Sequence, residues 1–546
     1  MIKKIKLLLL SITVITMGGC SEDFLETKPT DAISAADALT SSDNLLLVLS
    51  GLHRILYSQN GFIPGGSNDR AGEHYFIPMN DAITGNLIHS SRANNLGCQD
   101  ELQWISHTNA QSATTEHLWY QRYQVIASAS AIINKVKSGS LTMDAKLSHI
   151  VGQAYAYRAW AYHDLITHYA KGYLIGTPAT DPGVPLNLGT TAPYHSGPRA
   201  TVEDVYKQIK EDINLAIDYL NNGTNPGSGS SLKAHISVNA AYGIKARVAL
   251  SSGDWSTAAS AAAAARNGFT LMTEAQYKTG FNTLSLSEVI WGSNVIATET
   301  VFFRAYFYML SPTFNGSHNR ACPKICDKEK YNLLPATDYR RSLFLPMAPN
   351  TNGAASNNQG GSYLKDPNYS STSAAVFSAA KTAIITQYKM TSAHNTHPYM
   401  HVKFLQKNPG SIDPDDIIYM RASEMILIEA EAKAMDNDII GAQNALDILA
   451  KTRNPSFNKT VFDTKPKLMT EIKLQRYFEL YGEGFSYTDH IRWDQGIDLT
   501  NSGAAQVLYQ DGFIQAKPSV NPKWVFKIPQ KEIDANPYID EADQNP

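Results

Sequence analysis

The sequence has little charge and no marked excess of either sign. Of its 546 residues 18% are charged, and 47 Lys and Arg face 50 Asp and Glu, which gives a net charge of −3. A nucleic-acid-binding domain carries a basic patch or stripe, so this composition argues against that class. No glycine-rich phosphate loop follows a strand pattern, which argues against a nucleotide-binding protein.

Cysteine is also scarce, with four residues in the chain. Cys20 belongs to the N-terminal segment considered below, and the others are Cys98, Cys322 and Cys326. An exported protein permits disulfides. The spacing does not decide which of the three pair, or whether all are free thiols. A zinc site would need a fourth ligand, for which His318 is nearby, but we expect no metal and no cofactor.

Two other groups of possible metal ligands have simpler explanations. Pro398 breaks any helix that could carry the histidine group, so we expect a solvent-exposed loop there. That group comprises His394, His397 and His401. The acidic group lacks the spacing of an EF-hand, and a calcium site there has no support. Its members are Asp413, Asp415 and Asp416.

Long apolar runs are absent except at the N-terminus. Lys3, Lys4 and Lys6 precede the apolar residues 7–15, and Gly18-Gly19-Cys20 follows. This is the pattern of a signal peptide, and the run is shorter than the ~20 residues that span a bilayer. Because it resembles a bacterial lipobox, we expect cleavage after residue 19 and lipidation of Cys20. The alternative is an ordinary secretory signal with an incidental cysteine. We expect a mature protein anchored to a membrane by lipid, without a spanning segment.

Residues 417–453 have the pattern of two antiparallel helices joined at 436–438. The first is apolar on nearly all sides, which predicts a buried helix. Its charged residues Arg421, Glu424 and Glu431 lie on one stripe, because they follow helical spacing through Ile428. Buried charges must be paired.

A second helical hairpin is predicted at residues 238–266. Ala246 and Ala258 stand twelve residues apart, as Ala430 and Ala442 do in the first hairpin. Small residues at such positions let two helices approach closely. The repetition predicts a mainly α fold with a tetratricopeptide-like helical-repeat scaffold.

The rest of the chain divides into helical and irregular parts. Further helices are expected at residues 42–56, 119–136, 147–169, 201–220 and 468–481. Residues 287–297 are expected to form a short strand. Residues rich in Gly, Asn, Ser and Pro predict a long loop at 58–100 and a loop-rich lobe, containing a few short strands, at 311–416.

Four stretches carry recognisable motifs in order along the chain. They are DFLETKP from residue 23, IIYMRASEMILIEAEA from 417, LQRYFELYGEGFSYTDHIRW from 474 and FKIPQKEIDANP from 526. Together they resemble the SusD/RagB family of outer-membrane nutrient-binding lipoproteins. The resemblance implies a signal peptide at 1–19, an N-terminal SusD-like region at 20–310, the loop-rich lobe at 311–416, and a C-terminal region at 417–546 that completes the scaffold.

The residues that match the family motifs are expected to be structural and to face inward. They are Arg421, Glu424, Glu431, Arg476, Glu479, Glu483, Asp489, Arg492 and Trp493. Glu479 and Glu483 lie one helical turn apart, but a glycosidase also needs a cleft and two different environments for its carboxyl groups. We therefore expect no enzyme.

The resemblance implies a surface-exposed lipoprotein of the outer membrane, facing the cell exterior. It would act with a SusC-like TonB-dependent transporter, binding an oligosaccharide and handing it to the transporter without catalysis. The alternative is a binding protein for peptides or another nutrient on the same scaffold.

Two loop stretches, 79–99 and 306–320, correspond in order to family segments that line the glycan site. They supply the side chains such a site needs, namely a stacking ring in Phe314 and hydrogen-bonding groups. The expected ligand-binding residues are Asn80, Asp81, His89, Arg92, Asn94, Tyr306, Phe314, Asn315, His318 and Arg320. Neither stretch contains Trp, which argues against an extended helical glucan as ligand.

Overall fold

The computed structural model describes residues 37–58, 72–92, 97–189, 197–296, 298, 304–351 and 366–546. Cys20 and Asn94 lie outside the described residues. The helices are α2 (Ser42–Tyr57), α3 (Glu73–Ile83), α4 (Gln99–Leu102), α5 (Ala113–Lys137), α6 (Ala145–Tyr169), α7 (Val202–Asn221), α8 (Val238–Ser251), α9 (Trp255–Ala265), α10 (Glu274–Tyr277), α11 (Tyr306–Leu310), α12 (Ser317–Ala321), α13 (Lys328–Leu333), α15 (Ala374–Gln387), α16 (Ala422–Met435), α17 (Ile439–Arg453), α18 (Lys465–Glu479), α19 (Ser486–Arg492), α20 (Gln506–Tyr509) and α21 (Gln530–Ala535). The strands are β1 (Ile88–His89), β2 (Pro182–Pro185), β3 (Arg199–Thr201), β4 (Val289–Ser293), β5 (Lys324–Ile325), β6 (Phe344–Leu345), β7 (Met400–His401), β8 (Ile417–Arg421), β9 (Ile497–Asp498) and β10 (Ile514–Gln515).

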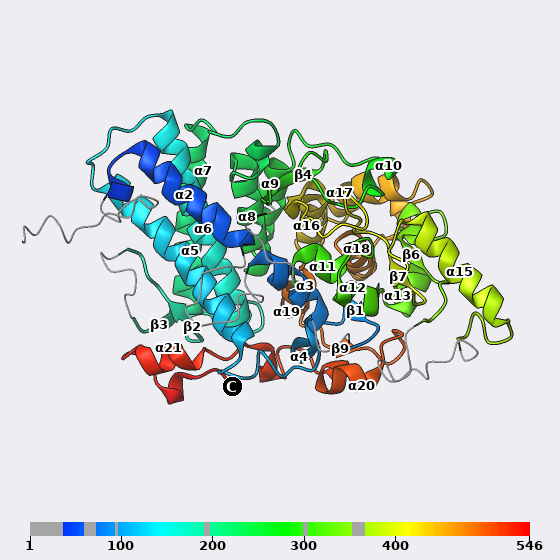
Figure 1. The fold of residues 1–546 in the computed structure, drawn as a ribbon. Helices are drawn as coiled ribbons and strands as arrows, with labels where there is room; N and C mark the ends of the chain where they lie inside the picture. The colour runs from blue at the N-terminus through cyan, green and yellow to red at the C-terminus, as the bar shows by residue number, and fades with distance from the viewer. Residues whose placement is uncertain are drawn as a thin grey trace, which may run out of the picture.

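The helices form a stack in which neighbours along the chain pack on one another. Helices α5 to α9 follow in order, α16 packs on α9, and α17 and α18 pack on α16 (Figure 1). The two predicted hairpins are present as α8–α9 and α16–α17. The four alanines that mark them are all fully buried, which confirms the mainly helical scaffold. None of the described helices combines the length and apolarity that crossing a membrane requires.

The α16–α17 hairpin differs from its prediction at the beginning. Ile417–Arg421 is a strand, β8, and the helix begins at Ala422. β8 pairs antiparallel with β4, which confirms the strand expected near residues 287–297. The misassignment has a simple cause, because a short apolar run buried on both faces has no periodicity that separates strand from helix. The turn is as predicted, with Asn437 in the left-handed region at φ 65°.

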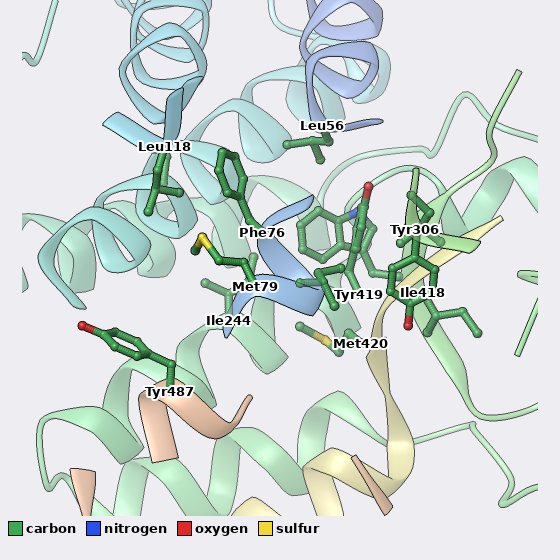
Figure 2. Packing of buried hydrophobic residues seen from close by; sticks show 14 of the residues in the cluster. Leu56, Phe76, Met79, Leu118, Ile244, Tyr306, Ile418, Tyr419, Met420 and Tyr487 are labelled. Carbon is green, nitrogen blue, oxygen red and sulfur yellow. The ribbon is translucent and has the colours of Figure 1, made fainter. Parts of the chain in front are cut away.

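Residues 58–100 were expected to be a loop, and they contain the buried helix α3. All eleven residues of α3 are buried, so no exposed face produces an amphipathic pattern in the sequence. Figure 2 shows Phe76 and Met79 of α3 among side chains from surrounding helices, including Leu118, Ile244 and Tyr487. The helix follows Gly72, whose φ of 76° is strained for other residues. A Cβ at this position would lie 2.9 Å from the Leu56 carbonyl oxygen.

The lobe at 311–416 contains the predicted short strands, and one strand of its sheet comes from elsewhere. The antiparallel sheet has the order β1-β5-β7-β6, and β1 belongs to the N-terminal region. The sequence did not predict α15. This helix has no buried residue, and it lies at the end of the molecule that is farthest from α5 and α7 (Figure 1).

The histidines and the cysteines of this region differ from, or decide between, what the sequence predicted. His394, His397 and His401 are buried, not exposed, because the segment that carries them enters the sheet at β7. All three cysteines outside the N-terminal segment are buried free thiols, so the disulfide alternative fails.

A buried network of eight charged groups joins the scaffold to the loop-rich lobe. Its centre is the fully buried Glu479, whose carboxylate accepts hydrogen bonds from Arg340, Arg421 and Arg453 at 3.0–3.1 Å. Burial by itself would raise the pKa of Glu479, but the guanidinium groups of Arg453, Arg421 and Arg340 hold it well below its usual value. Four cations and four carboxylates therefore balance: Arg340, Arg421, Arg453 and Lys403 with Asp338, Glu288, Glu479 and Glu483.

The other motif residues are paired as well. Glu431 accepts from Arg492 at 2.8 and 3.0 Å and from Trp493 Nε1 at 2.8 Å. Asp489 accepts from Arg476 and Arg492, each at 2.8 Å. The remaining member, Glu424, accepts two hydrogen bonds of 2.7 Å from Arg247 of α8. The motif residues thus face inward and pair, as predicted.

We expect Arg421→Ala to lower the free energy of unfolding by about 3–5 kcal/mol, since it leaves buried carboxylates without their cation. Urea unfolding at neutral pH measures the change. Arg266→Ala is the matched control, because Arg266 pairs with Glu429 but its side chain is 28% exposed. We expect about 1 kcal/mol or less for the control. Equal losses in the two variants would show that the network does not stabilise the fold in this way.

Candidate functional site

The two stretches expected to form a ligand site lie side by side. In the pairing of β1 with β5, Ile88 is opposite Ile325 and His89 is opposite Lys324. The Ser91 hydroxyl donates to the carbonyl of Ala321 at 2.8 Å. The sheet therefore brings segment 88–92 against the end of segment 306–320, although about 230 residues separate them in sequence.

Within these stretches the side chains divide into a buried and an exposed set. The buried set comprises Asn80, Asp81, His89, Tyr306, Phe314 and His318. Arg92 and Asn315 are exposed and Arg320 is partly exposed. The expectation that Phe314 presents a free stacking face is wrong for this conformation, since its side chain is 1% exposed. The ring instead packs edge-on against Tyr308.

The polar members of the buried set have partners inside the protein. Asn80 Oδ1 lies 3.0 Å from His168 Nε2. Asp81 accepts a hydrogen bond of 3.1 Å from the backbone N–H of Ser486. The Tyr306 hydroxyl donates to the carbonyl of Gly482 at 3.1 Å. These contacts attach α3 to α6 and to the C-terminal region, and α11 to the C-terminal region, so the three side chains have a supporting role.

A buried basic cluster lies directly beneath the exposed set. The rings of His89 and His318 are 5.7 Å apart, and Lys324 Nζ lies 2.9 Å from His318 Nε2. Burial lowers the pKa of both histidines well below the usual value, which makes them neutral near pH 7. The cluster thus fills the space under the surface with one amine and two neutral rings.

Part of this cluster has the composition of a metal site. Donor atoms of His89, His318 and Cys322 all lie within 4.8 Å of one another. Lys324, however, contacts His318 and donates to the carbonyl of Cys322 at 2.8 Å, so its amine already occupies the polar centre. The acidic group near residue 415 is likewise engaged by protein, because Lys407 Nζ lies 3.5 Å from Asp416.

The exposed set is joined by two further segments, at residues 395 and 411, that the motifs did not single out. Arg320 Nη1 donates to Asn315 Oδ1 at 3.3 Å. The backbone N–H of Asn395 donates to the carbonyl of Arg320 at 2.8 Å, and that of Asn315 donates to Ser411 at 2.9 Å. The surface therefore offers guanidinium and amide groups, which donate and accept in the way a polyhydroxylated ligand requires. Asn395 has no sequence signal beyond its place in a polar loop.

Comparison with known proteins identifies related chains. Residues 67–250 match a family model described as starch-binding associating with outer membrane, and residues 325–546 match the model of the SusD family. A curated SusD-like protein of Bacteroides ovatus is 27% identical over 264 residues. That alignment covers 46% of this chain and spans 40% of the length of the relative.

Solved structures share the fold over nearly the whole chain. A SusD-like carbohydrate-binding protein of Bacteroides vulgatus has a TM-score of 0.71 at 21% identity, covering 93% of this chain and 98% of that one. A SusD superfamily protein of Bacteroides thetaiotaomicron has a TM-score of 0.69 at 20% identity, covering 93% and 100%. A surface glycan-binding protein A of Bacteroides fluxus has a TM-score of 0.62 at 16% identity, covering 93% and 99%.

Asp81 generates a prediction about pH. Burial raises its pKa to about 6, so the folded state keeps a proton that the unfolded state loses near pH 4. This contribution therefore lowers stability as pH rises from about 4 to about 6. In Asp81→Asn the contribution is absent, and the variant should gain on the order of 2 kcal/mol relative to wild type between pH 4 and pH 7. Urea unfolding across this range measures the difference. The exposed Asp436 provides the control substitution. Parallel pH profiles for Asp81→Asn and wild type would contradict the prediction.

Proposed function

The chain belongs to the SusD/RagB family, and on that basis we propose that it is a carbohydrate-binding protein of the cell surface. Two family models that match successive parts of the chain support this role. The observation that carries the proposal is that the segment ending at Arg92 is held against the segment that carries Asn315 and Arg320, although the two are distant in sequence. Binding proteins place such residues on loops held by a rigid scaffold.

We assign direct contact with the glycan to the exposed set and to Asn94. The buried set, with His318 beneath the surface, would hold those contacts in place. Sugars present many hydroxyl groups, and each must exchange water for a protein partner. A surface site buries little area and must offset this desolvation, so we expect weak binding.

We propose that the protein does not catalyse glycan cleavage. A retaining or inverting glycosidase needs two carboxyl groups beside the bond, with the pKa of one raised so that it can act as an acid. The motif carboxylates Glu479 and Glu483 are enclosed by Arg421 and its neighbours. These cations hold the pKa of both carboxyl groups below the usual value, against the effect of burial.

The cellular setting is the remaining part of the proposal. The protein would be anchored in the outer membrane by lipid on Cys20, facing the exterior, and would hand its oligosaccharide to a SusC-like TonB-dependent transporter. The lipobox pattern and the family membership support this arrangement.

Binding by the exposed surface is tested with the double variant Arg92→Ala/Arg320→Ala. A glycan array identifies the ligand of wild type, and calorimetry then measures affinity. Loss of two charged donors should weaken binding at least about tenfold, without changing the thermal midpoint. Lys207→Ala, an exposed substitution on α7, is the control. Unchanged affinity in the double variant would place the site elsewhere. If wild type binds no glycan on the array, the carbohydrate role itself fails.

Anchoring is tested with Cys20→Ala. We expect the variant to leave the membrane fraction while its folded domain keeps the wild-type thermal midpoint, because only the acyl chains hold it to the bilayer. Fractionation in high salt, in cells that lack the cognate transporter, removes retention by a protein partner. A variant that still sediments with the outer membrane under these conditions would exclude a lipid anchor at this position.

A further inference from the structure

A groove opens between α13, α18 and α19. It shares no lining residue with the surface of Arg92, Asn315 and Arg320, which is called the Arg92 surface below. Its volume is about 470 Å³, within the range of about 300–1,000 Å³ found for small-molecule sites. Leu333 of α13 and Leu474 of α18 contribute apolar walls, and Thr84 and Asn86, which follow α3, also line it.

Two lysine ammonium groups of the groove lie over aromatic rings. Lys330 Nζ lies 4.3 Å from the ring centroid of Tyr477. Lys473 Nζ lies 4.7 Å from that of Trp493. Such cation–π contacts hold each amine at the wall of the groove.

The donors of the groove exceed the acceptors that they meet. An ammonium group has three N–H donors. Lys330 lies 3.2 Å from Asp327, and Lys473 donates to Gln495 at 2.9 Å. One such partner for each leaves donors on both amines. Arg476 also lines the groove, and its buried Nη1 has no hydrogen-bond partner among the described residues.

The acidic side chains of the groove are either buried and paired or exposed. Asp489 is held by two arginines. Asp327 caps α13 by accepting the backbone N–H groups of residues 329 and 330. Asp498 accepts from Thr500 and is exposed, and Glu329 is exposed. The groove therefore has spare N–H donors on Lys330 and Lys473, and its two buried carboxylates, Asp327 and Asp489, are paired, which favours an anion.

We propose that this groove binds an anionic sugar residue, whose carboxylate or sulfate ester is held by Lys330 and Lys473. The C–H face of the sugar would lie against Leu333 and Leu474. The sugar identity rests on the proposed carbohydrate role, whereas the preference for an anion rests on the groove alone. The groove would then select anionic glycans, while the Arg92 surface would contact other sugar residues of the same glycan.

The test compares matched oligosaccharide pairs by calorimetry. The first pairs are uronate-containing oligosaccharides and their carboxyl-reduced forms, and the second are sulfated oligosaccharides and their desulfated forms. The variant is Lys330→Gln/Lys473→Gln, which removes both charges and keeps a polar side chain at each position. Lys467→Gln is the control on the same helix, since Lys467 lies outside the groove and is paired with Asp463. Thermal midpoints verify folding of each variant.

We expect wild type to bind an anionic probe at least about tenfold more tightly than its neutral partner, and the groove variant to lose this difference. The control should keep it. Which set of pairs shows the difference identifies a carboxylate or a sulfate ester. The inference is overturned if wild type has no preference for any anionic probe, or if the groove variant retains the preference. Either result leaves the carbohydrate role standing wherever neutral glycans bind.

Discussion

The fold depends on neutralising one carboxylate that has no access to water. Glu479 ends α18, and the three guanidinium groups around it come from β8, from the last residue of α17 and from the loop-rich lobe at Arg340. Removing such a charge from water costs several kcal/mol, which only simultaneous contact with its partners offsets. The scaffold and the lobe therefore reach their folded structures together, because neither can bury these charges without the other. This gives a physical reason why a protein without described disulfides can hold loops against a helical stack.

The same constraint separates structural from functional polarity. Charged motif residues lie inside and pair with one another, and the groups proposed to contact a ligand lie in the short helix α12 and in the connection before it, such as Arg320 and Asn315. A scaffold with internally balanced charges exerts no strong field on those connections. Their side chains can therefore vary with the ligand while the network stays the same, consistent with one fold serving different nutrients.

Features with a local periodicity could be predicted from the sequence. Features that depend on contacts between distant parts of the chain could not. The spacing of Arg421, Glu424 and Glu431 predicted buried pairing, although Arg421 belongs to a strand. The helix α3 was missed because a helix buried on all sides has no amphipathic pattern. The site residues show the same limit. The family resemblance predicted one site containing Arg92 and Arg320, but whether Phe314 lies at the surface depends on neighbours that no local pattern encodes.

The sheet beneath the candidate site also determines when that site can exist. β1 near residue 88 pairs with β5 near residue 325, and β5 in turn pairs with β7 near residue 400. Contacts of such long sequence separation form slowly, because a large loop must close before any pairing stabilises it. Helices α5 to α7 contact one another locally and can assemble early. A chain synthesised N-terminus first thus has helices α5 to α9 complete before β5 and β7 exist. The surface proposed to bind the ligand can therefore form only after residue 401 has been added.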